Sequence, residues 1–359
     1  MNNREPNINA FEKVLMIGPG GNKGGIASVI QTYKKNYKGI HFLSSYPEST
    51  GASKLLHFIR CFLSTHKILR SNKEIAIVHL HVASKGSFIR KSILLVLAKL
   101  HRKSVVFHMH AGAFNRFYGK TYLKNLMIKR LMAWSDNVIC LSEEWRSFYV
   151  NTLKLNQTSI LGNPVDKINC YIKEQKHETV NLLYLGKICD DKGIFELVSV
   201  LSQNEMYLEG KIKLSIAGFG ETGRLIEFIH TLDYIKNIEW LGWIEGEAKE
   251  KAICTCDVFI LPSFYEGLPV SIIECMMCAK PIIATRVGGT PKLVENGVNG
   301  WIYQAGDRDA LDAILNDVVI QKDKLELLGM NSRTKAQEFH PAKIKTELIA
   351  LYKNLTASA

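Results

Sequence analysis

The chain has 359 residues, of which 47% are hydrophobic and 22% charged, and only 9 are prolines. These values exclude a disordered or collagen-like chain and predict about two globular domains of ~150 residues each. The charge is uneven: up to position 176 there are 27 basic and 9 acidic residues, a net charge of +18, whereas the remainder has 19 and 25, a net charge of −6. A basic first half favours contact with nucleic acid or with an anionic membrane face.

The first 13 residues are polar and give no secretory signal. The longest apolar run, residues 93–98, is far shorter than the ~20 residues that span a bilayer. We therefore expect a soluble cytoplasmic protein whose eight cysteines are reduced thiols. The spacings Cys254-x-Cys256 and Cys275-x-x-Cys278 could hold zinc, but both pairs fall in apolar helix and strand sequence, which favours buried thiols.

Short β-rich runs alternate with amphipathic stretches along the chain, the pattern of parallel βαβ units. The predicted strands are 14–18, 41–44, 75–81, 104–110 and 138–142 in the first half, and 181–186, 213–218, 238–241, 258–262, 281–285 and 301–303 in the second. Predicted helices include 195–201, 222–232 and 271–278. The pattern restarts near Asn181 after a polar stretch, 167–179. This predicts two doubly wound α/β domains facing a cleft, with ligands at the carboxyl ends of the strands.

The first strand runs into a glycine-rich turn, GPGGNKGGI. Backbone N–H groups of Gly24 and Gly25 at the following helix start could bind an anion. The turn lacks the residues of a P-loop, and locally a plain strand-to-helix turn explains it equally well.

Two later stretches, 53–73 and 88–103, combine apolar stripes with lysine and arginine. Basic amphipathic helices of this kind can lie in an anionic membrane interface, although core-facing helices with solvated faces give the same pattern.

In the second half, Lys187 leaves a strand and Lys192 precedes the next helix, so that both ammonium groups could hold a diphosphate. The most informative segment follows the strand at 258–262: a loop with Glu266, Gly267 and Leu268, and a helix from about Val270 that carries Glu274. Carboxylates accept hydrogen bonds from sugar hydroxyls, and amides at a helix start can meet phosphate oxygens. Glu274 lies among apolar residues and therefore needs a partner.

Here the sequence resembles the retaining GT-B glycosyltransferases of family 4, whose hallmark is two glutamates separated by seven residues. Glu266 and Glu274 match this hallmark. The segment LYLGKICDDKG resembles a second motif of the family, a strand followed by Gly-Arg and then Lys-Gly, with Lys187 in place of the arginine. VVFHMHAGAF places His110 on the family's active-site histidine, and SIAGFGE, with Gly218, resembles a nucleoside-binding region.

The resemblance implies a GT-B fold: an acceptor-binding domain over 1–170, completed by a helix at about 341–359 that crosses back, and a nucleotide-sugar domain over 171–340. It implies catalytic roles for His110 and Glu266. It places Gly24, Gly25, Lys187, Lys192, Gly218, Gly267, Leu268 and Glu274 at the donor, in which Glu274 would hold the ribose.

The expected reaction moves a hexose or N-acetylhexosamine from a nucleotide diphosphate sugar, with a UDP-sugar favoured, to a lipid-linked saccharide in O-antigen or capsule assembly. Protein cations and amides would stabilise the leaving diphosphate, so we expect no cofactor and no metal. Asp307 and Asp309 would then belong to a helix cap rather than to a metal site. The expected location is the inner face of the plasma membrane. A nucleotide-sugar epimerase and a nucleic-acid-binding protein remain as alternatives.

Overall fold

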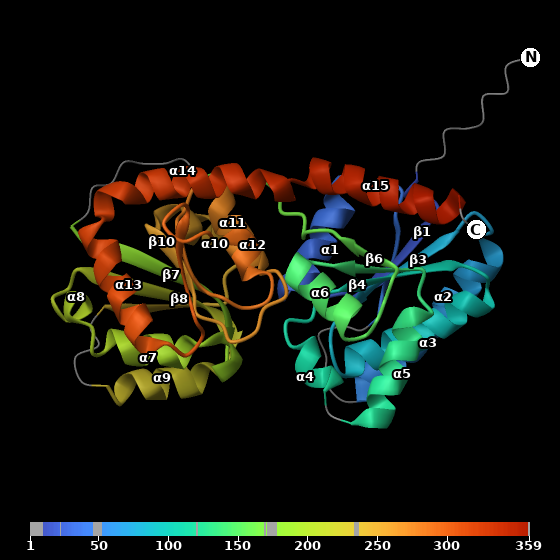
Figure 1. Ribbon diagram of the computed structural model, residues 1–359, viewed down its shortest axis with the longest axis horizontal. Coiled ribbons are helices and arrows are strands. Elements are labelled where there is room, and N and C mark those ends of the chain that lie inside the picture. The colour runs from blue at the N-terminus through green and yellow to red at the C-terminus, as the bar shows by residue number, and fades with distance from the viewer. Residues whose placement is uncertain are drawn as a thin grey trace, which may run out of the picture. The chain divides into compact units, whose positions relative to one another are not determined.

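The computed structural model describes residues 10–21, 23–45, 52–119, 121–168, 170, 178–232 and 237–357. The chain divides into two compact units: unit 1 comprises residues 1–165 and 339–359, and unit 2 comprises residues 166–338. The boundaries expected from the sequence were 170/171 and 340/341, and residues 171–177 of the expected linker lie outside the described residues. Each unit has a six-stranded parallel sheet with flanking helices (Figure 1), which confirms the predicted fold class.

Unit 1 has the strand order β2-β1-β3-β4-β5-β6. Its strands are β1 (Val14–Gly18), β2 (His41–Ser44), β3 (Ile77–Val82), β4 (Ser104–Met109), β5 (Asn137–Cys140) and β6 (Thr158–Ile160). Every residue of β1 and β3 is buried, as expected for central strands of a sheet that helices cover on both faces. The sequence analysis missed β6, because its three residues are too short to show a periodicity.

The helices of unit 1 are α1 (Gly25–Asn36), α2 (Ala52–Ser71), α3 (Gly86–Leu100), α4 (Phe114–Tyr118), α5 (Tyr122–Ala133), α6 (Glu143–Asn151) and α15 (Pro341–Ala357). α15 packs on α1 and β3 (Figure 1), and thus completes unit 1 with residues from the end of the chain, as the resemblance implied. Tyr37 on α1 donates from its hydroxyl to the backbone oxygen of Pro341 at 2.9 Å.

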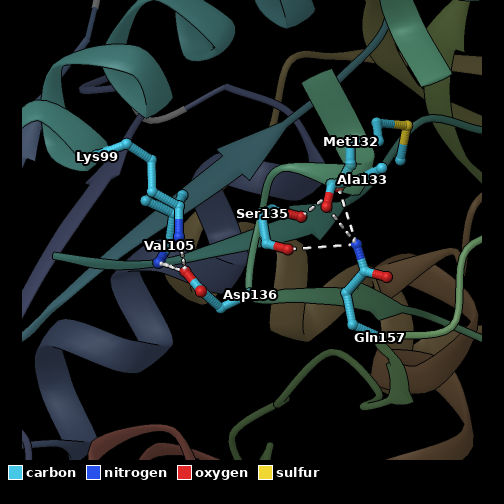
Figure 2. Close-up of polar contacts among 7 residues, drawn as sticks. All are labelled: Lys99, Val105, Met132, Ala133, Ser135, Asp136 and Gln157. Atoms are coloured by element: carbon cyan, nitrogen blue, oxygen red, sulfur yellow. Dashed lines mark hydrogen bonds and ion pairs between the residues drawn. The ribbon is translucent and has the colours of Figure 1, made fainter. Parts of the chain in front are cut away.

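Polar side chains fix the loop between α5 and β5 (Figure 2). Asp136 Oδ2 accepts from the backbone N–H of Val105 at 2.6 Å and pairs with Lys99 Nζ at 2.5 Å. Gln157 Nε2 donates to three backbone carbonyls at the end of α5 and just after it, those of Met132, Ala133 and Ser135. These contacts tie together the amino-terminal ends of β4, β5 and β6, and the carboxyl ends of the strands lie at the opposite edge of the sheet.

Unit 2 has the strand order β12-β11-β10-β7-β8-β9. Its strands are β7 (Val180–Ile188), β8 (Ile212–Gly220), β9 (Ile238–Gly242), β10 (Val258–Leu261), β11 (Ile282–Thr285) and β12 (Gly300–Tyr303). The six strands predicted for this half are all present, with ends that differ by at most two residues.

The helices of unit 2 are η1 (Asp190–Lys192), α7 (Ile194–Leu201), α8 (Glu205–Leu208), α9 (Thr222–His230), α10 (Gly246–Thr255), α11 (Val270–Met277), α12 (Thr290–Leu293), α13 (Arg308–Ile320), η2 (Lys322–Lys324), α14 (Leu325–Ala336) and η3 (Gln337–Phe339), the last of which crosses into unit 1. Asp307 caps α13 by accepting from the backbone N–H of Ala310 at 3.0 Å. This confirms the predicted capping role of the Asp-x-Asp sequence.

The expectation that all eight cysteines are reduced is wrong for two of them in this structure, because Cys170 and Cys254 form a disulfide. The partners are 84 residues apart, and Cys170 lies in a segment without periodicity, so only tertiary structure brings it to the end of α10. Cys61, Cys140, Cys256, Cys275 and Cys278 are buried thiols, and Cys189 is a half-buried thiol. No helix among the described residues is long and apolar enough to cross a membrane.

Candidate functional site

The strand order of each unit reverses direction at one point. In unit 2, the chain extends from β7 through β8 to β9 on one side and then returns to place β10 on the other side of β7. In doubly wound sheets, ligands bind beside the carboxyl ends of the strands at such a point. Lys187 lies near the carboxyl end of β7, and the segments that follow β7 and β10 carry Lys192 and Glu266. The topology therefore places three predicted site residues where this fold class binds ligands.

Lys192 and Glu266 lie in direct contact. Lys192 Nζ is 2.5 Å from Glu266 Oε1, and Ser263 Oγ donates to the same carboxylate oxygen at 2.7 Å. The Glu266 side chain is only 8% exposed, whereas that of Lys192 is 26% exposed. A buried carboxylate requires such partners, because desolvation of an unpaired charge costs several kcal/mol. The pair thus holds a carboxylate in a fixed position while one ammonium face remains open to an anion.

The backbone beside this pair depends on a glycine. Gly193, at the start of α7, has φ +69°, and a Cβ there would lie 2.0 Å from the backbone oxygen of Pro262. The backbone N–H of Phe264 donates to the oxygen of Asp191 at 2.9 Å. The loops after β7 and β10 are therefore in contact along their backbones, which brings Lys192 within reach of Glu266.

Glu274 lies on α11, one helix further along the chain, and is 7% exposed. Because Glu274 lies among apolar residues, its carboxylate was expected to have a polar partner. The structure confirms this: Lys249 Nζ on α10 is 2.6 Å from Glu274 Oε1. The loop before α11 is fixed by a hydrogen bond from the N–H of Gly289 to the oxygen of Gly267 at 2.8 Å. Unit 2 thus contains two carboxylate–ammonium pairs joined by one loop and one helix.

Three further predicted site residues differ in their surroundings. Gly218 faces Gly186 across β7 and β8, and a Cβ on Gly218 would lie 1.8 Å from the oxygen of Gly186, so only glycine fits. Leu268 is buried, with 4% exposure. Lys187, near the end of β7, is exposed, and within the described residues no carboxylate lies within 4.0 Å of its ammonium. Lys187 is therefore a cation available to an anionic ligand, and unlike Lys192 it has no carboxylate partner among the described residues.

Unit 1 reverses between β1 and β3, which are neighbours in its sheet. The glycine-rich turn follows β1, and α1 begins at Gly25. Gly24, with φ +95°, adopts a backbone conformation that favours glycine. Beside this turn, four histidines lie on one face of the sheet: His79 and His81 on β3, His108 on β4, and His110 directly after β4. They share a face because residues two apart lie on the same side of a strand and His81 pairs with His108 across the strands.

These histidines form two hydrogen-bonded chains. His81 Nδ1 is 2.8 Å from His110 Nε2, and His79 Nε2 is 3.2 Å from His108 Nδ1. His79 Nδ1 in turn contacts the Tyr352 hydroxyl on α15 at 2.6 Å. Burial lowers the pKa of His79 and of His110 to about 3 and lowers the pKa values of His81 and His108 well below 6.5. All four imidazoles are therefore neutral at pH 7, each with one N–H and one lone pair.

The protons can be placed on this network from its unpaired atoms. Among the described residues, His81 Nε2 and His108 Nε2 are buried without a hydrogen-bond partner. A buried lone pair is tolerated better than a buried N–H, which favours the proton on Nδ1 in both residues. His81 Nδ1 then donates to His110 Nε2, and His110 carries its own proton on Nδ1. The N–H of His110 then lies on Nδ1, the ring nitrogen that does not contact His81.

The nitrogens of His79, His81 and His108 lie close enough to suggest a metal site, since one ligand atom from each falls within 4.8 Å of the others. However, the His81 ring stacks on those of His79 and His108 with interplanar angles of 29°. An ion must lie in the plane of each imidazole that binds it, and stacked rings do not share such a point. This geometry favours the hydrogen-bonded arrangement over a common ion.

Residues 172–335 match the family model of glycosyl transferases group 1. This part of the chain is a group 1 glycosyltransferase domain. Two solved structures share the fold over the whole chain: HepE of Anabaena in complex with UDP-glucose (TM-score 0.76, 20% identity, 96% of this chain and 99% of that one) and sucrose-phosphate synthase of Thermosynechococcus elongatus (TM-score 0.80, 18% identity, 96% and 99%). The family match thus covers most of unit 2, and the likeness to the two solved structures shows the GT-B fold over 96% of the chain.

Relatives by sequence include the amylovoran biosynthesis glycosyltransferase AmsK of Erwinia amylovora, 26% identical over 52% of this chain and 48% of AmsK. The capsular polysaccharide biosynthesis glycosyltransferase CapM of Staphylococcus aureus is 26% identical over 65% of both chains. An uncharacterized glycosyltransferase of Methanocaldococcus jannaschii is 22% identical over 93% of this chain and 95% of that protein. The chain thus matches about half of AmsK but nearly all of the archaeal protein.

Several side chains of the candidate site were not predicted from the sequence. Lys249 and Ser263 contact the two site carboxylates, and His81 contacts His110. For His81 a signal existed, because alternate histidines on neighbouring predicted strands must share a face of the sheet. For Lys249 none existed, since its contact with Glu274 depends on how two helices pack.

Proposed function

We propose that this glycosyltransferase transfers a hexose or N-acetylhexosamine from a UDP-sugar to a lipid-linked saccharide during assembly of a bacterial surface polysaccharide, with retention at the anomeric carbon. The observation that carries the proposal is the two buried carboxylates of unit 2, Glu266 and Glu274, each paired with an ammonium group. The names of AmsK and CapM refer to polysaccharide biosynthesis, and HepE was solved with UDP-glucose, which supports the choice of pathway and donor.

The chemistry of glycosyl transfer explains this arrangement of charges. Breaking the bond between the anomeric carbon and the diphosphate leaves negative charge on the departing phosphate. Lys187 is exposed and Lys192 keeps part of its ammonium open, so both can receive that charge. Glu266 can accept hydrogen bonds from sugar hydroxyls while Lys192 and Ser263 hold it in place. Glu274 would accept hydrogen bonds from the ribose of the donor.

Donor binding tests this assignment. UDP and a set of UDP-sugars are expected to raise the melting temperature of the protein, and Glu274→Gln is expected to weaken their binding by about 10- to 100-fold, because a hydrogen bond to a charged acceptor contributes ~1.5–3 kcal/mol. The exposed Glu250→Gln on α10 is the matched control and should bind as the wild type does. A larger response to GDP or ADP would contradict the choice of UDP, and unchanged binding by Glu274→Gln would contradict its role.

Transfer itself distinguishes the proposal from epimerisation. A radiolabelled UDP-sugar and a lipid extract of bacterial membranes should give a labelled lipid product, whereas an epimerase would release a new nucleotide sugar without any acceptor. Turnover in excess chelator should equal turnover without it, because protein cations meet the leaving diphosphate. Activity lost in chelator and restored by manganese would refute the metal-independent mechanism.

We also propose that unit 1 binds an anionic membrane surface. Exposed apolar side chains lie on three helices of this unit, α2, α3 and α5: Leu55, Leu56, Ile59, Leu63, Ile89, Ile93, Leu100, Tyr122, Leu123 and Met127. α2 packs on α3 (Figure 1), and α2 also carries the exposed cations Lys54, Arg60 and Arg70. Apolar side chains inserted between lipid headgroups, with cations that each contribute ~1 kcal/mol, would hold the enzyme beside a lipid-linked acceptor.

Vesicle flotation tests this surface. The wild type should float with vesicles that contain phosphatidylglycerol more than with neutral vesicles. Ile59→Glu/Leu63→Glu, at positions 45% and 59% exposed on α2, should abolish most of that binding. The control Leu327→Glu/Met330→Glu changes residues 61% and 57% exposed on α14 of unit 2 and should float as the wild type does. Equal flotation with neutral and anionic vesicles would refute the proposal.

A further inference from the structure

Three cysteines from separate parts of unit 2 meet at one place. Cys254 lies near the end of α10, Cys278 is the C-cap of α11, and Cys170 lies before both in the chain, after β6. One sulfur atom from each lies within 4.8 Å of the other two, although Cys170 and Cys254 are bonded in this structure. Zinc with Zn–S distances of ~2.3 Å at tetrahedral angles separates its sulfur ligands by about 3.8 Å. The Cys278 sulfur thus lies within reach of a common zinc ion with the other two sulfurs, which are 2.12 Å apart in the disulfide and would separate on reduction.

We propose that Cys170, Cys254 and Cys278 bind a zinc ion through three thiolates when the protein is reduced, and that the Cys170–Cys254 disulfide is the oxidised form of the same site. A dithiol reductant breaks the disulfide, yields two cysteine thiols and is itself converted to a disulfide. Zn²⁺ then displaces one proton from each of the three thiols. The fourth coordination position is left to water, as in zinc sites with three protein ligands.

The surroundings suit an anionic zinc complex, since three thiolates and Zn²⁺ carry a net charge of −1. Lys280 Nζ donates to the backbone oxygens of Cys254 at 2.8 Å and Cys256 at 2.6 Å, so that an ammonium lies beside the site. Cys278 is the buried member of the three, and a buried thiolate needs a nearby cation such as zinc. Cys170 and Cys254 are half-buried, which leaves a route for the ion from solvent.

The other cysteines of the chain differ from these three. Cys61, Cys140, Cys256 and Cys275 are buried thiols outside the cluster, and Cys256 donates from its sulfur to the oxygen of Ile253 at 3.2 Å. This is the behaviour expected of cysteine as a small buried residue. From the sequence spacing, the possible zinc ligands were residues 254, 256, 275 and 278. In the structure, Cys254 and Cys278 cluster with Cys170, and Cys256 and Cys275 lie outside the cluster.

The position of the cluster links it to the donor site. α10 carries both Cys254 and Lys249, and α11 carries Glu274 and ends at Cys278. A zinc ion would therefore join the carboxyl-terminal ends of the two helices whose Lys249–Glu274 pair is 2.6 Å long. The inference concerns metal binding and does not depend on the proposed transfer reaction. In the disulfide form, Cys170 and Cys254 cannot bind zinc. The oxidised protein is therefore the form in which turnover with and without chelator should be compared.

Zinc content tests the proposal. The full-length protein is reduced anaerobically with a dithiol, freed of reductant, mixed with two equivalents of ZnCl₂, and gel-filtered before metal analysis. We expect one zinc per chain in the reduced wild type and none retained by Cys278→Ser. The control Cys189→Ser removes a half-buried thiol outside the cluster and should retain the ion. Cobalt in place of zinc should give a thiolate-to-cobalt charge-transfer band that Cys278→Ser lacks.

Several results would overturn the proposal. These are a reduced wild type without zinc, one zinc per chain in Cys278→Ser, or the same zinc content in the oxidised and reduced proteins. Circular dichroism of each variant guards against misfolding. If Cys278→Ser fails to fold, Cys170→Ser replaces it, because this half-buried residue lies outside the helices, and retention of the ion by Cys170→Ser likewise refutes the site.

Discussion

Glu266→Gln is expected to lower the rate of sugar transfer by about 100-fold or more while donor affinity changes little, because it removes a fixed charge beside the reacting sugar. The carboxylate is buried against Lys192 Nζ at 2.5 Å and Ser263 Oγ at 2.7 Å. Glutamine keeps the size of the side chain and can still accept from both partners, so the loop should keep its conformation. Steady-state kinetics with a UDP-sugar donor provide the measurement, with kcat and KM determined separately.

Two further variants sharpen this test. Glu245→Gln replaces an exposed carboxylate of unit 2 and should leave kcat unchanged. Lys192→Met removes the ammonium but leaves Glu266 buried without its cation, and it should therefore lower both transfer and thermal stability. Wild-type kcat for Glu266→Gln would show that the carboxylate does not take part in transfer, whatever its effect on folding.

Unit 1 is expected to lose stability steeply below pH 6.5, while unit 2 responds less. His79, His81 and His108 are at most 1% exposed, and their pKa values in the folded protein lie below the unfolded value of 6.5, mainly because burial disfavours the charged imidazole. The unfolded chain binds more protons than the folded chain between pH 6.5 and the folded pKa values. The contribution of these histidines to the stability of unit 1 is therefore complete above pH 6.5 and is lost as the pH falls below it. Each histidine contributes about 1 kcal/mol per pH unit.

Hydrogen exchange followed by mass spectrometry measures this effect in both units at once. After correction for intrinsic rates, peptides that cover β3 and β4 should lose protection between pH 7.5 and 5.5 by more than 100-fold. Peptides that cover β10 and β11 provide the internal control, because unit 2 has no buried histidine among its described residues. Equal loss of protection in both units would contradict the assignment. The assignment would also be wrong if His41→Asn, a substitution at an exposed histidine, removed the pH effect.

Lys91 is the other titratable cation that faces this histidine cluster. It lies fully buried on α3, donates to Ser45 Oγ, and has a pKa lowered to about 7 by burial. A lysine is protonated in the unfolded chain up to about pH 10, so the destabilisation by Lys91 grows as pH falls from 10 to 7 and stays constant below pH 7. Lys91 therefore adds little to the change in stability below pH 6.5. The steep response at low pH therefore belongs mainly to the imidazoles.

The motifs of the candidate site were visible in the sequence because they are local. Glu266 and Glu274 are separated by one loop and little more than one helical turn, and the buried strand before them, Val258–Leu261, is apolar throughout. Such a strand in a parallel sheet ends at the edge where ligands bind. The spacing of the two acids and the strand-end positions of Lys187 and His110 could thus be predicted without coordinates.

The amino-acid sequence by itself determined the succession of strands and helices, because hydrophobic periodicity acts over a few residues, and it determined which acids, lysines and glycines stand at strand ends. Only the tertiary structure decided two of the partners, Lys249 for Glu274 and Cys170 for Cys254. Each of these contacts joins elements that are distant in the chain or lie on different strands or helices. Their side-chain distances follow from how sheets and helices pack, and no local pattern encodes that packing.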